Sequence, residues 1–278
     1  MTLRTAVINL RCGADIAANL DHAEHYIRAA YKDGAKFIVT PENTLLMQGN
    51  TKKLFAEIKS EQETKGVAYF SALAKELCID LLIGSMAIKV APDKAGRGKA
   101  ANRSYMFGPD GSIKARYDKI HMFDVTISES ETWKESANYQ AGDTPVLTEA
   151  GGFNIGLSIC YDLRFANLYK YYAQTGAHIL TVPAAFTAIT GEAHWRTLLQ
   201  ARAIETSAYV LAAAQGGIHD NGRATWGRSM IVDPWGEVVA ELNNDKPGFC
   251  CANLSLDFIN KTRARIPAWQ QSTDLTAK

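Results

Sequence analysis

A chain of 278 residues, 47% of them hydrophobic, is long enough to bury a full core. Its 30 Lys and Arg residues balance 29 Asp and Glu residues, so its charge gives no reason to expect nucleic acid or an anionic membrane as a partner. The apolar runs are too short to span a membrane, the chain does not begin with a secretory signal, and its five cysteines form no C-x-x-C pair. We therefore expect a reduced, cytoplasmic protein without a disulfide framework.

The first half of the chain alternates predicted strands and helices. Short β-branched runs predict strands at 4–10, 35–40 and 80–88. Helical periodicity predicts helices between them, at 14–34 and 65–78, so the order is β-α-β-α-β. This order is typical of an α/β fold in which helices pack on a sheet. A Pro-Asp-Gly turn between two alternating runs then predicts a hairpin over 104–117.

The second half repeats this order. We expect strands at 153–160, 178–183 and 209–214, with helices between them at 163–175 and 192–207. A Pro-Trp-Gly turn predicts a second hairpin over 229–242. No linker or low-complexity segment separates the two halves. The sequence therefore predicts one domain, residues 1–278, in which two similar halves contribute two packed sheets.

Cys160 stands between an apolar run and a charged, helix-like segment. A free cysteine on an apolar strand is more often a small core residue. However, the carboxyl ends of strands are where α/β sheets place ligand crevices, and the backbone N–H of Tyr161 would point the same way, toward an oxyanion. Because a thiol is mostly protonated at neutral pH, a catalytic Cys160 needs a base. His178, His194 and a carboxylate are all candidates.

Two further polar residues follow predicted strands. Glu42 lies beside Leu45 and Leu46, and burial there predicts a raised carboxyl pKa, which suits a general base, although a capping carboxylate is the simpler interpretation. Lys119 follows the first hairpin among apolar residues, where a lysine usually has a partner or extends to solvent. Three strands thus end in Glu, Lys and Cys.

Other chemistries have little support in the sequence. Six dispersed histidines without an H-E-x-x-H pattern predict no metal site, and no serine lies in a G-x-S-x-G turn. The one glycine-rich loop lacks the spacing of a phosphate loop. We expect neither a metal nor an organic cofactor.

Three separated motifs resemble the nitrilase superfamily of carbon–nitrogen hydrolases: Pro41-Glu42-Asn43, Asp118-Lys119-Ile120-His121 and Cys160-Tyr161-Asp162-Leu163-Arg164-Phe165. The similarity extends from Arg4 to Leu275. It implies an α/β fold of the α-β-β-α sandwich type with two mixed sheets, which assembles into a homodimer or a higher homo-oligomer and uses no cofactor. It also implies that Glu42, Lys119 and Cys160 are catalytic, and that Glu135, which matches a second family glutamate, orients Lys119 and the substrate.

The resemblance implies a thioester mechanism. Glu42 takes the thiol proton, Cys160 attacks the amide carbonyl, and Lys119 and the Tyr161 N–H stabilise the oxyanion. Glu42 then returns the proton to the departing ammonia and activates the water that hydrolyses the thioester.

The residues after the cysteine resemble the amidase branch of the superfamily. This implies a small-molecule substrate, the terminal amide of an α-keto acid-type compound such as deaminated glutathione or 2-oxoglutaramate. It further implies that Arg164 clamps a substrate carboxylate and that Phe186 and Thr190 bind substrate. The alternatives are an ion pair of Arg164 with Asp162 or Glu205, and a purely core position for Phe186.

Several alternatives stay open at this point. The chain fits a nitrilase or carbamoylase of the same fold, a non-catalytic scaffold, or a Cys–His thiol enzyme that uses His178 or His194. Two departures from the branch pattern bear on the substrate: Arg228 stands where a histidine is usual, and Gly216-Gly217 replaces a Cys-Gly pair.

Overall fold

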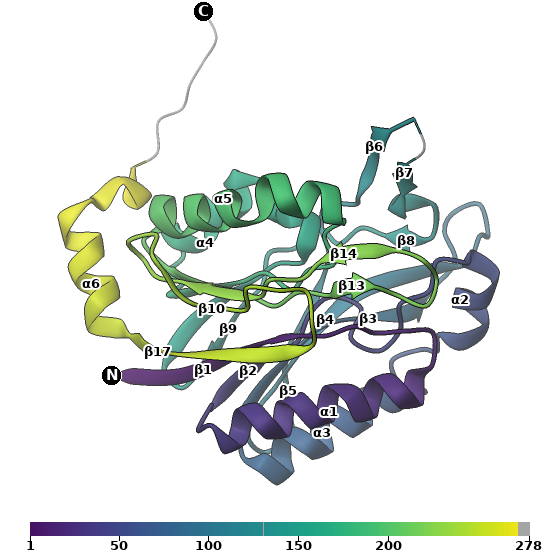
Figure 1. The fold of residues 1–278 in the computed structure, drawn as a ribbon, viewed down its shortest axis with the longest axis horizontal. Coiled ribbons are helices and arrows are strands. Elements are labelled where there is room, and N and C mark those ends of the chain that lie inside the picture. The colour runs from purple at the N-terminus through teal and green to yellow at the C-terminus, as the bar shows by residue number, and fades with distance from the viewer. Residues whose placement is uncertain (130, 272–278) are drawn as a thin grey trace, which may run out of the picture.

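Two mixed β-sheets pack face to face between two pairs of helices (Figure 1). The computed structural model describes residues 1–129 and 131–271. The end of the expected family resemblance, 272–275, and the end of the expected domain, 272–278, lie outside the described residues. The four layers confirm the α-β-β-α sandwich with two mixed sheets that the sequence predicts.

The first sheet has the strand order β17-β1-β2-β3-β4-β5, with β8 paired to β4. Strands β1, β2 and β3 run parallel to one another. The pairs β17–β1, β3–β4 and β4–β5 are antiparallel, and β8 pairs parallel to β4. The bounds are β1 Thr2–Asn9, β2 Phe37–Val39, β3 Asp80–Val90, β4 Lys99–Phe107, β5 Ile113–Asp118, β8 Tyr139–Gln140 and β17 Gly248–Ser255.

The second sheet has the order β16-β15-β12-β11-β10-β9, in which β10, β11 and β12 run parallel. The bounds are β9 Leu147–Ala150, β10 Phe153–Leu157, β11 Ile179–Thr181, β12 Tyr209–Ala212, β15 Met230–Val232 and β16 Val238–Glu241. Two small antiparallel pairs lie apart from both sheets: β6 Asp124–Ser128 with β7 Glu131–Lys134, and β13 Gly216–Ile218 with β14 Ala224–Trp226.

The predicted similarity of the two halves is confirmed. In each sheet, three parallel strands lead into an antiparallel hairpin, β4–β5 in the first and β15–β16 in the second. The strand expected at 153–160 was too long, because it ends at Leu157. After that strand the Cys160 N–H donates to the Pro183 carbonyl at 2.8 Å, and a 3-10 turn, Cys160–Arg164, begins.

The helices cover the outer faces of the two sheets. In Figure 1, α1 and α3 lie on one side of the sandwich and α4 and α5 on the other. The bounds are α1 Ile16–Lys32, α2 Thr51–Glu57, α3 Lys65–Leu77, α4 Ala166–Gln174, α5 Ala188–Thr206 and α6 Leu256–Arg265, with further 3-10 turns at Glu135–Ala137 and Pro267–Gln270. No helix among the described residues has both the length and the apolar character to cross a lipid bilayer.

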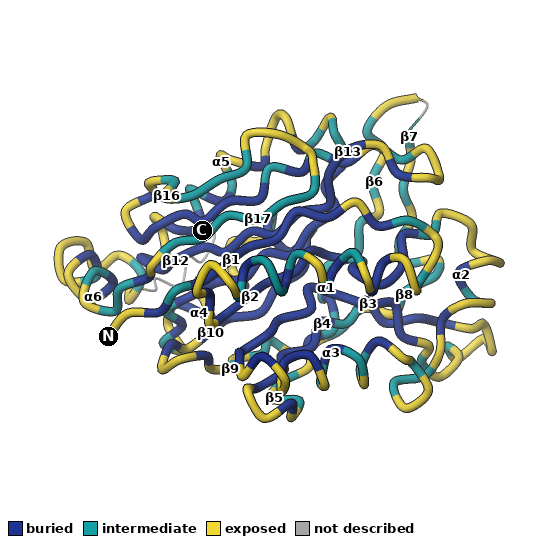
Figure 2. The backbone as a smooth tube through the Cα atoms, turned by 60° about the horizontal axis from the view of Figure 1, so that its bottom comes forward, coloured by how far each residue is buried: buried dark blue, intermediate teal, exposed yellow. Residues whose placement is uncertain are grey.

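Alternation along the strands creates the layers. On β1, Val7 packs into the core between the two sheets, whereas its neighbours Ala6 and Ile8 face α1 and α3. Helix α1 buries Leu20, Ala23, Ile27 and Ala30, which are spaced three or four residues apart and so share one face. Figure 2 shows the result: buried strands run through the centre, and exposed segments gather at the edges.

Candidate active site

The four predicted catalytic residues line one cavity of about 330 Å³. Glu42 lies beyond the end of β2, Lys119 directly after β5, Cys160 after β10 and Glu135 after β7. Three of these segments are far apart in sequence. They meet because the carboxyl ends of β2 and β10 and the end of β5 lie at the same end of the sandwich.

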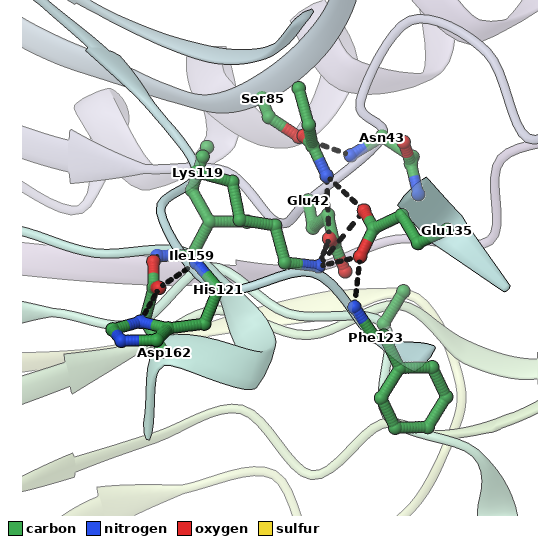
Figure 3. Close-up of polar contacts among 12 residues, drawn as sticks. Glu42, Asn43, Ser85, Lys119, His121, Phe123, Glu135, Ile159 and Asp162 are labelled. Atoms are coloured by element: carbon green, nitrogen blue, oxygen red, sulfur yellow. Dashed lines mark hydrogen bonds and ion pairs between the residues drawn. The ribbon is translucent and has the colours of Figure 1, made fainter. Parts of the chain in front are cut away.

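Lys119 links the two carboxylates (Figure 3). Its Nζ lies 2.9 Å from Glu42 Oε1 and 2.9 Å from Glu135 Oε2. Glu135 also accepts a hydrogen bond from the Phe123 N–H at 2.7 Å, which holds its carboxylate toward Lys119. Glu42 and Lys119 are only 3% and 1% exposed, so this ion pair is shielded from water and from salt.

Cys160 lies against the same carboxylate. Its thiol lies close enough to the Glu42 carboxylate and to the backbone N–H of Ala185 for both groups to influence its pKa. The cysteine adopts a φ of 50°, a left-handed conformation that is uncommon for a residue with a side chain. The turn thus directs the sulfur to Glu42 at a cost in backbone strain.

The segment that carries Glu42 is equally constrained. Thr44 Oγ1 donates to the Pro41 carbonyl at 2.7 Å, the Asn43 N–H donates to Ser85 Oγ at 3.0 Å, and Asn43 has a φ of 58°. A side chain at Gly84 would place a Cβ 2.1 Å from the Thr40 carbonyl oxygen and 2.4 Å from Pro183 Cβ. Glycine at 84 therefore allows the segments before Glu42 and after β11 to approach closely.

These contacts set the charges of the site. Burial is the largest single influence on Glu42 and opposes its ionisation, but the charge and hydrogen bond of Lys119, the charge of Arg223 and the Cys160 thiol together place the pKa of Glu42 below its usual value. The expected upward shift was therefore wrong in sign, because the cations and hydrogen-bond donors around Glu42 together exceed the effect of burial. Burial also opposes the charge on Lys119, yet Glu135 and Glu42 raise its pKa well above the usual value. Burial and the Glu42 charge raise the pKa of the Cys160 thiol. At neutral pH the site therefore holds a neutral thiol beside an ionised carboxylate.

Neither candidate histidine contacts the thiol. His178 Nδ1 accepts a hydrogen bond from the Asn154 N–H at 3.1 Å, and His194 Nδ1 lies 3.3 Å from Arg164 Nη1. The structure thus pairs Cys160 with a carboxylate among the candidates that the sequence left open.

The three predicted substrate-binding residues line the same cavity. The Arg164 guanidinium lies 5.2 Å from the Phe186 ring centroid and 5.9 Å from that of Tyr161. Within the described residues, Arg164 forms no ion pair with a carboxylate. Phe186 is only 6% exposed, as expected for a core residue, and it also forms part of the cavity wall, as expected for a residue that binds substrate. Thr190 lies in the first turn of α5, where its N–H donates to Thr187 Oγ1 at 3.3 Å.

The rival ion-pair partners of Arg164 are occupied elsewhere. Asp162 is fully buried and accepts hydrogen bonds from the Ile159 N–H, the Tyr117 hydroxyl and the His121 N–H at 2.8 to 3.0 Å. Glu205 pairs with Arg202 at 2.8 Å. Asp162 therefore fixes the turn that begins at Cys160, a role that the sequence reasoning missed.

Asn102 and Arg223 were also missed. Asn102 Nδ2 donates to Glu42 Oε1 at 2.9 Å and to Glu135 Oε1 at 3.2 Å, and Arg223 lines the cavity. An asparagine inside the apolar strand β4 was a usable signal, because a buried polar group needs partners. Arg223 lies just before β14, and nothing in its local sequence separates it from an exposed loop arginine.

Among residues 1–129 and 131–271, no three His, Cys, Asp or Glu side chains gather in an arrangement that would hold a metal ion. The charged and nucleophilic groups that line the cavity are a thiol, two carboxylates, two ammonium groups and two guanidiniums. The fold and this site define a thiol hydrolase of the α-β-β-α sandwich class.

Comparison with known proteins identifies the family. The carbon-nitrogen hydrolase family model matches residues 4–264. The chain is 39% identical over 267 residues to deaminated glutathione amidase of Synechocystis, covering 95% of this chain and 96% of that protein. It is 34% identical over 277 residues to omega-amidase NIT2 of Homo sapiens. That alignment covers 99% of this chain and 97% of the human protein. The chain therefore belongs to the carbon–nitrogen hydrolase family and is an enzyme that hydrolyses a carbon–nitrogen bond, which confirms the resemblance to the nitrilase superfamily.

The fold agrees with solved structures. The crystal structure of the C. elegans NitFhit protein superposes with a TM-score of 0.86 at 31% identity. This chain is covered to 98%, and it spans 65% of that longer protein. The structure of Saccharomyces cerevisiae Nit3 superposes with a TM-score of 0.83 at 27% identity.

Proposed function

We propose that this enzyme hydrolyses the amide of a small carboxylated compound, an ω-amide of an α-keto acid such as deaminated glutathione, through a thioester on Cys160. One observation carries the proposal: the Cys160 thiol lies beside an ionised Glu42 in a cavity that also presents an arginine free of carboxylate partners among the described residues. A thiol, a base and an anion-binding group then face one bound molecule.

In the first half-reaction, the Cys160 proton moves to Glu42 as the sulfur attacks the amide carbon and forms an S–C bond. The carbonyl oxygen becomes an oxyanion. Lys119 has three N–H donors, two of which point to Glu42 and Glu135, so the third is available to the oxyanion together with the Tyr161 N–H. Glu42 next donates its proton to the nitrogen, the C–N bond breaks, and ammonia or an amine leaves.

In the second half-reaction, Glu42 takes a proton from water as the water oxygen attacks the thioester carbon. The tetrahedral oxyanion uses the same donors. Collapse breaks the S–C bond, releases the carboxylic acid, and returns the proton from Glu42 to the sulfur. Glu135 neither gains nor loses a proton in this scheme. It holds Lys119 in place while Glu42 changes charge.

The substrate class follows from the cavity wall. A guanidinium presents paired N–H donors that match the geometry of a carboxylate. Arg164 contacts the Tyr161 and Phe186 rings and has no carboxylate partner among residues 1–129 and 131–271. Relatives at 34% and 39% identity carry the names omega-amidase and deaminated glutathione amidase. The alternative substrate within the same scheme is 2-oxoglutaramate, and a nitrile or carbamoyl compound is the alternative bond type.

A substrate panel tests the proposal. Purified enzyme receives deaminated glutathione, 2-oxoglutaramate, the matching nitrile and an N-carbamoyl acid, and the released acid and ammonia or amine are measured. We expect hydrolysis of the α-keto acid amides, and a mass increase on Cys160 in rapidly quenched samples. Turnover of only the nitrile or carbamoyl compound would assign a different branch. Full activity in a Cys160→Ala variant would remove the thioester.

We also propose that the whole chain acts as one unit, assembles as a homodimer or a higher homo-oligomer, and works in the cytosol. Ile189 and Ile204 on α5 are 56% and 58% exposed, which provides an apolar face for a second copy. The five cysteines are all free thiols, which suits a reducing compartment. Light scattering of the purified protein measures the assembly, and a monomer at micromolar concentration would contradict it.

A further inference from the structure

A second arginine, Arg223, lines the same cavity at the other end of a row of aromatic rings. Its guanidinium lies 4.6 Å from the Trp133 ring centroid. Trp133 contacts Phe123 at 6.3 Å, and Phe123 contacts Tyr161 at 5.1 Å between ring centroids. Tyr161 in turn contacts the Arg164 guanidinium. Three rings that line the cavity thus have one cation at each end of the row.

Arg223 has no counter-ion of its own. In the part of the chain that the structure describes, its partners are the Ala185 carbonyl, to which Nη2 donates at 2.5 Å, and the Met47 sulfur, 3.8 Å from Nη1. Its Nε is buried without any hydrogen-bond partner. A half-buried guanidinium with one carbonyl and one thioether for five donors is incompletely satisfied, and an anion in the cavity would complete its shell.

The other charges of the cavity do not compete for this role. Glu42 and Glu135 both direct their carboxylates to Lys119, and among the described residues neither forms an ion pair with Arg223. Lys134 also lines the cavity, but its side chain is exposed and lies close enough to Asp124 to influence that carboxyl group. Lys119, Lys134, Arg164 and Arg223 face two carboxylates, Glu42 and Glu135, so the cavity lining carries a net positive charge. Among the described residues, neither guanidinium forms an ion pair with a carboxylate.

The position of Arg223 assigns it to one half of the substrate. The leaving nitrogen must lie beside Glu42, which donates its proton. Arg223 is among the cations that lower the pKa of Glu42, and it contacts Met47, five residues further along the same segment. A substituent on the leaving nitrogen therefore extends toward Arg223, whereas the acyl half extends past Tyr161 and Phe186 toward Arg164.

We propose that Arg223 binds a second carboxylate, carried by the amine half of the substrate, so that the preferred substrate is an N-substituted amide with one carboxylate on each side of the scissile bond. This inference rests on the proposed function, in which Arg164 binds the α-keto acid half. It assigns the enzyme to substituted amides in preference to primary amides, whose leaving group is ammonia and has no carboxylate to offer.

A purely structural role for Arg223 makes a different prediction. Its hydrogen bond to the Ala185 carbonyl supports the residue whose N–H contacts the Cys160 sulfur. If this support were the only role, loss of Arg223 would slow every amide by the same factor. The two roles are separated by comparing substrates that differ in one carboxylate.

The test uses deaminated glutathione and its glycine methyl ester, which lacks the amine-half carboxylate. We expect the wild-type enzyme to prefer the free acid by about tenfold to a hundredfold in kcat/KM, as for one charged hydrogen-bonded pair. Arg223→Met should collapse this preference toward one, and Arg223→Lys should restore part of it. Equal loss on both compounds, or no wild-type preference, would overturn the proposal.

A matched control is available beyond the other end of β14. Arg228 stacks on Trp226 at the same 4.6 Å, but it does not line the catalytic cavity. Arg228→Met should keep the full preference for the free acid. The outcome also separates the two proposals: if the wild-type enzyme hydrolyses neither compound nor 2-oxoglutaramate, the proposed function fails. If it hydrolyses them all without regard to the amine-half carboxylate, only the role of Arg223 fails.

Discussion

Asn102 offers a direct test of how the site controls its base. One amide group, Asn102 Nδ2, donates to both Glu42 and Glu135, and the side chain is 2% exposed. Replacement with leucine keeps the size of the side chain and removes the donor. The amide oxygen of Asn102 is buried without a partner in the described structure, so its loss leaves no hydrogen bond broken at that end.

The expected shift follows from the two hydrogen bonds. A hydrogen bond to a charged group contributes about 1.5–3 kcal/mol, and one pKa unit corresponds to about 1.4 kcal/mol. Because Nδ2 is shared between two carboxylates, we assign about half of that energy to Glu42. The donor favours the ionised form, so its removal raises the pKa of Glu42 by about one unit. The base must be ionised, and the acid limb of the activity profile therefore moves about one unit to higher pH.

The measurement is kcat/KM from about pH 3 to 8, which includes the region below the usual carboxyl pKa, for any amide that the enzyme hydrolyses. Asn138→Leu serves as the control, because Asn138 lines the same cavity but its Nδ2 donates to Thr51 Oγ1 at 3.1 Å. Its acid limb should stay in place. An acid limb in Asn102→Leu that is unmoved, or that moves to lower pH, would refute the assignment of the amide as a donor that stabilises ionised Glu42.

Three further predictions concern the same site. Lys119→Met should lower kcat about a hundredfold or more and the free energy of unfolding by about 3–5 kcal/mol, measured by kinetics and urea denaturation, because two buried carboxylates lose their cation; a stable, active variant would contradict this. Glu42→Gln should abolish acylation of the thiol in quenched-flow mass spectrometry while His178→Ala stays active, and the reverse pattern would restore the Cys–His interpretation. Gly84→Ala should cost about 1–3 kcal/mol and lower the melting temperature by several degrees, since its Cβ has no room; an unchanged melting temperature would show that the two loops separate freely.

The local sequence was sufficient to predict most of the fold. The order of strands and helices, both hairpins and the two packed sheets follow from periodicity and turn residues, which depend on neighbours within a few positions. The small pairs β6–β7 and β13–β14 were not predicted. Strands of three to five residues, such as Ala224–Trp226, carry too little periodic signal and form only where a partner is already in place.

The position of the thiol was predicted from sequence, whereas its surroundings were not. An apolar run that ends on Cys160 marks the end of a strand, but the left-handed φ of Cys160 and the Asp162 anchor appear only in the folded chain. The same holds for Asn102, which lies 60 residues from Glu42 in the sequence and hydrogen-bonds to it in space.

Sequence alone therefore determined which elements form and which residue types carry the chemistry, because both depend on short-range patterns. Only the tertiary structure decided the sign of the Glu42 pKa shift, the contacts of Asn102 with both carboxylates and the second cation at Arg223. Each of these depends on the distance between charges that the chain brings together from segments tens of residues apart, and electrostatic energy in a buried site changes steeply with that distance.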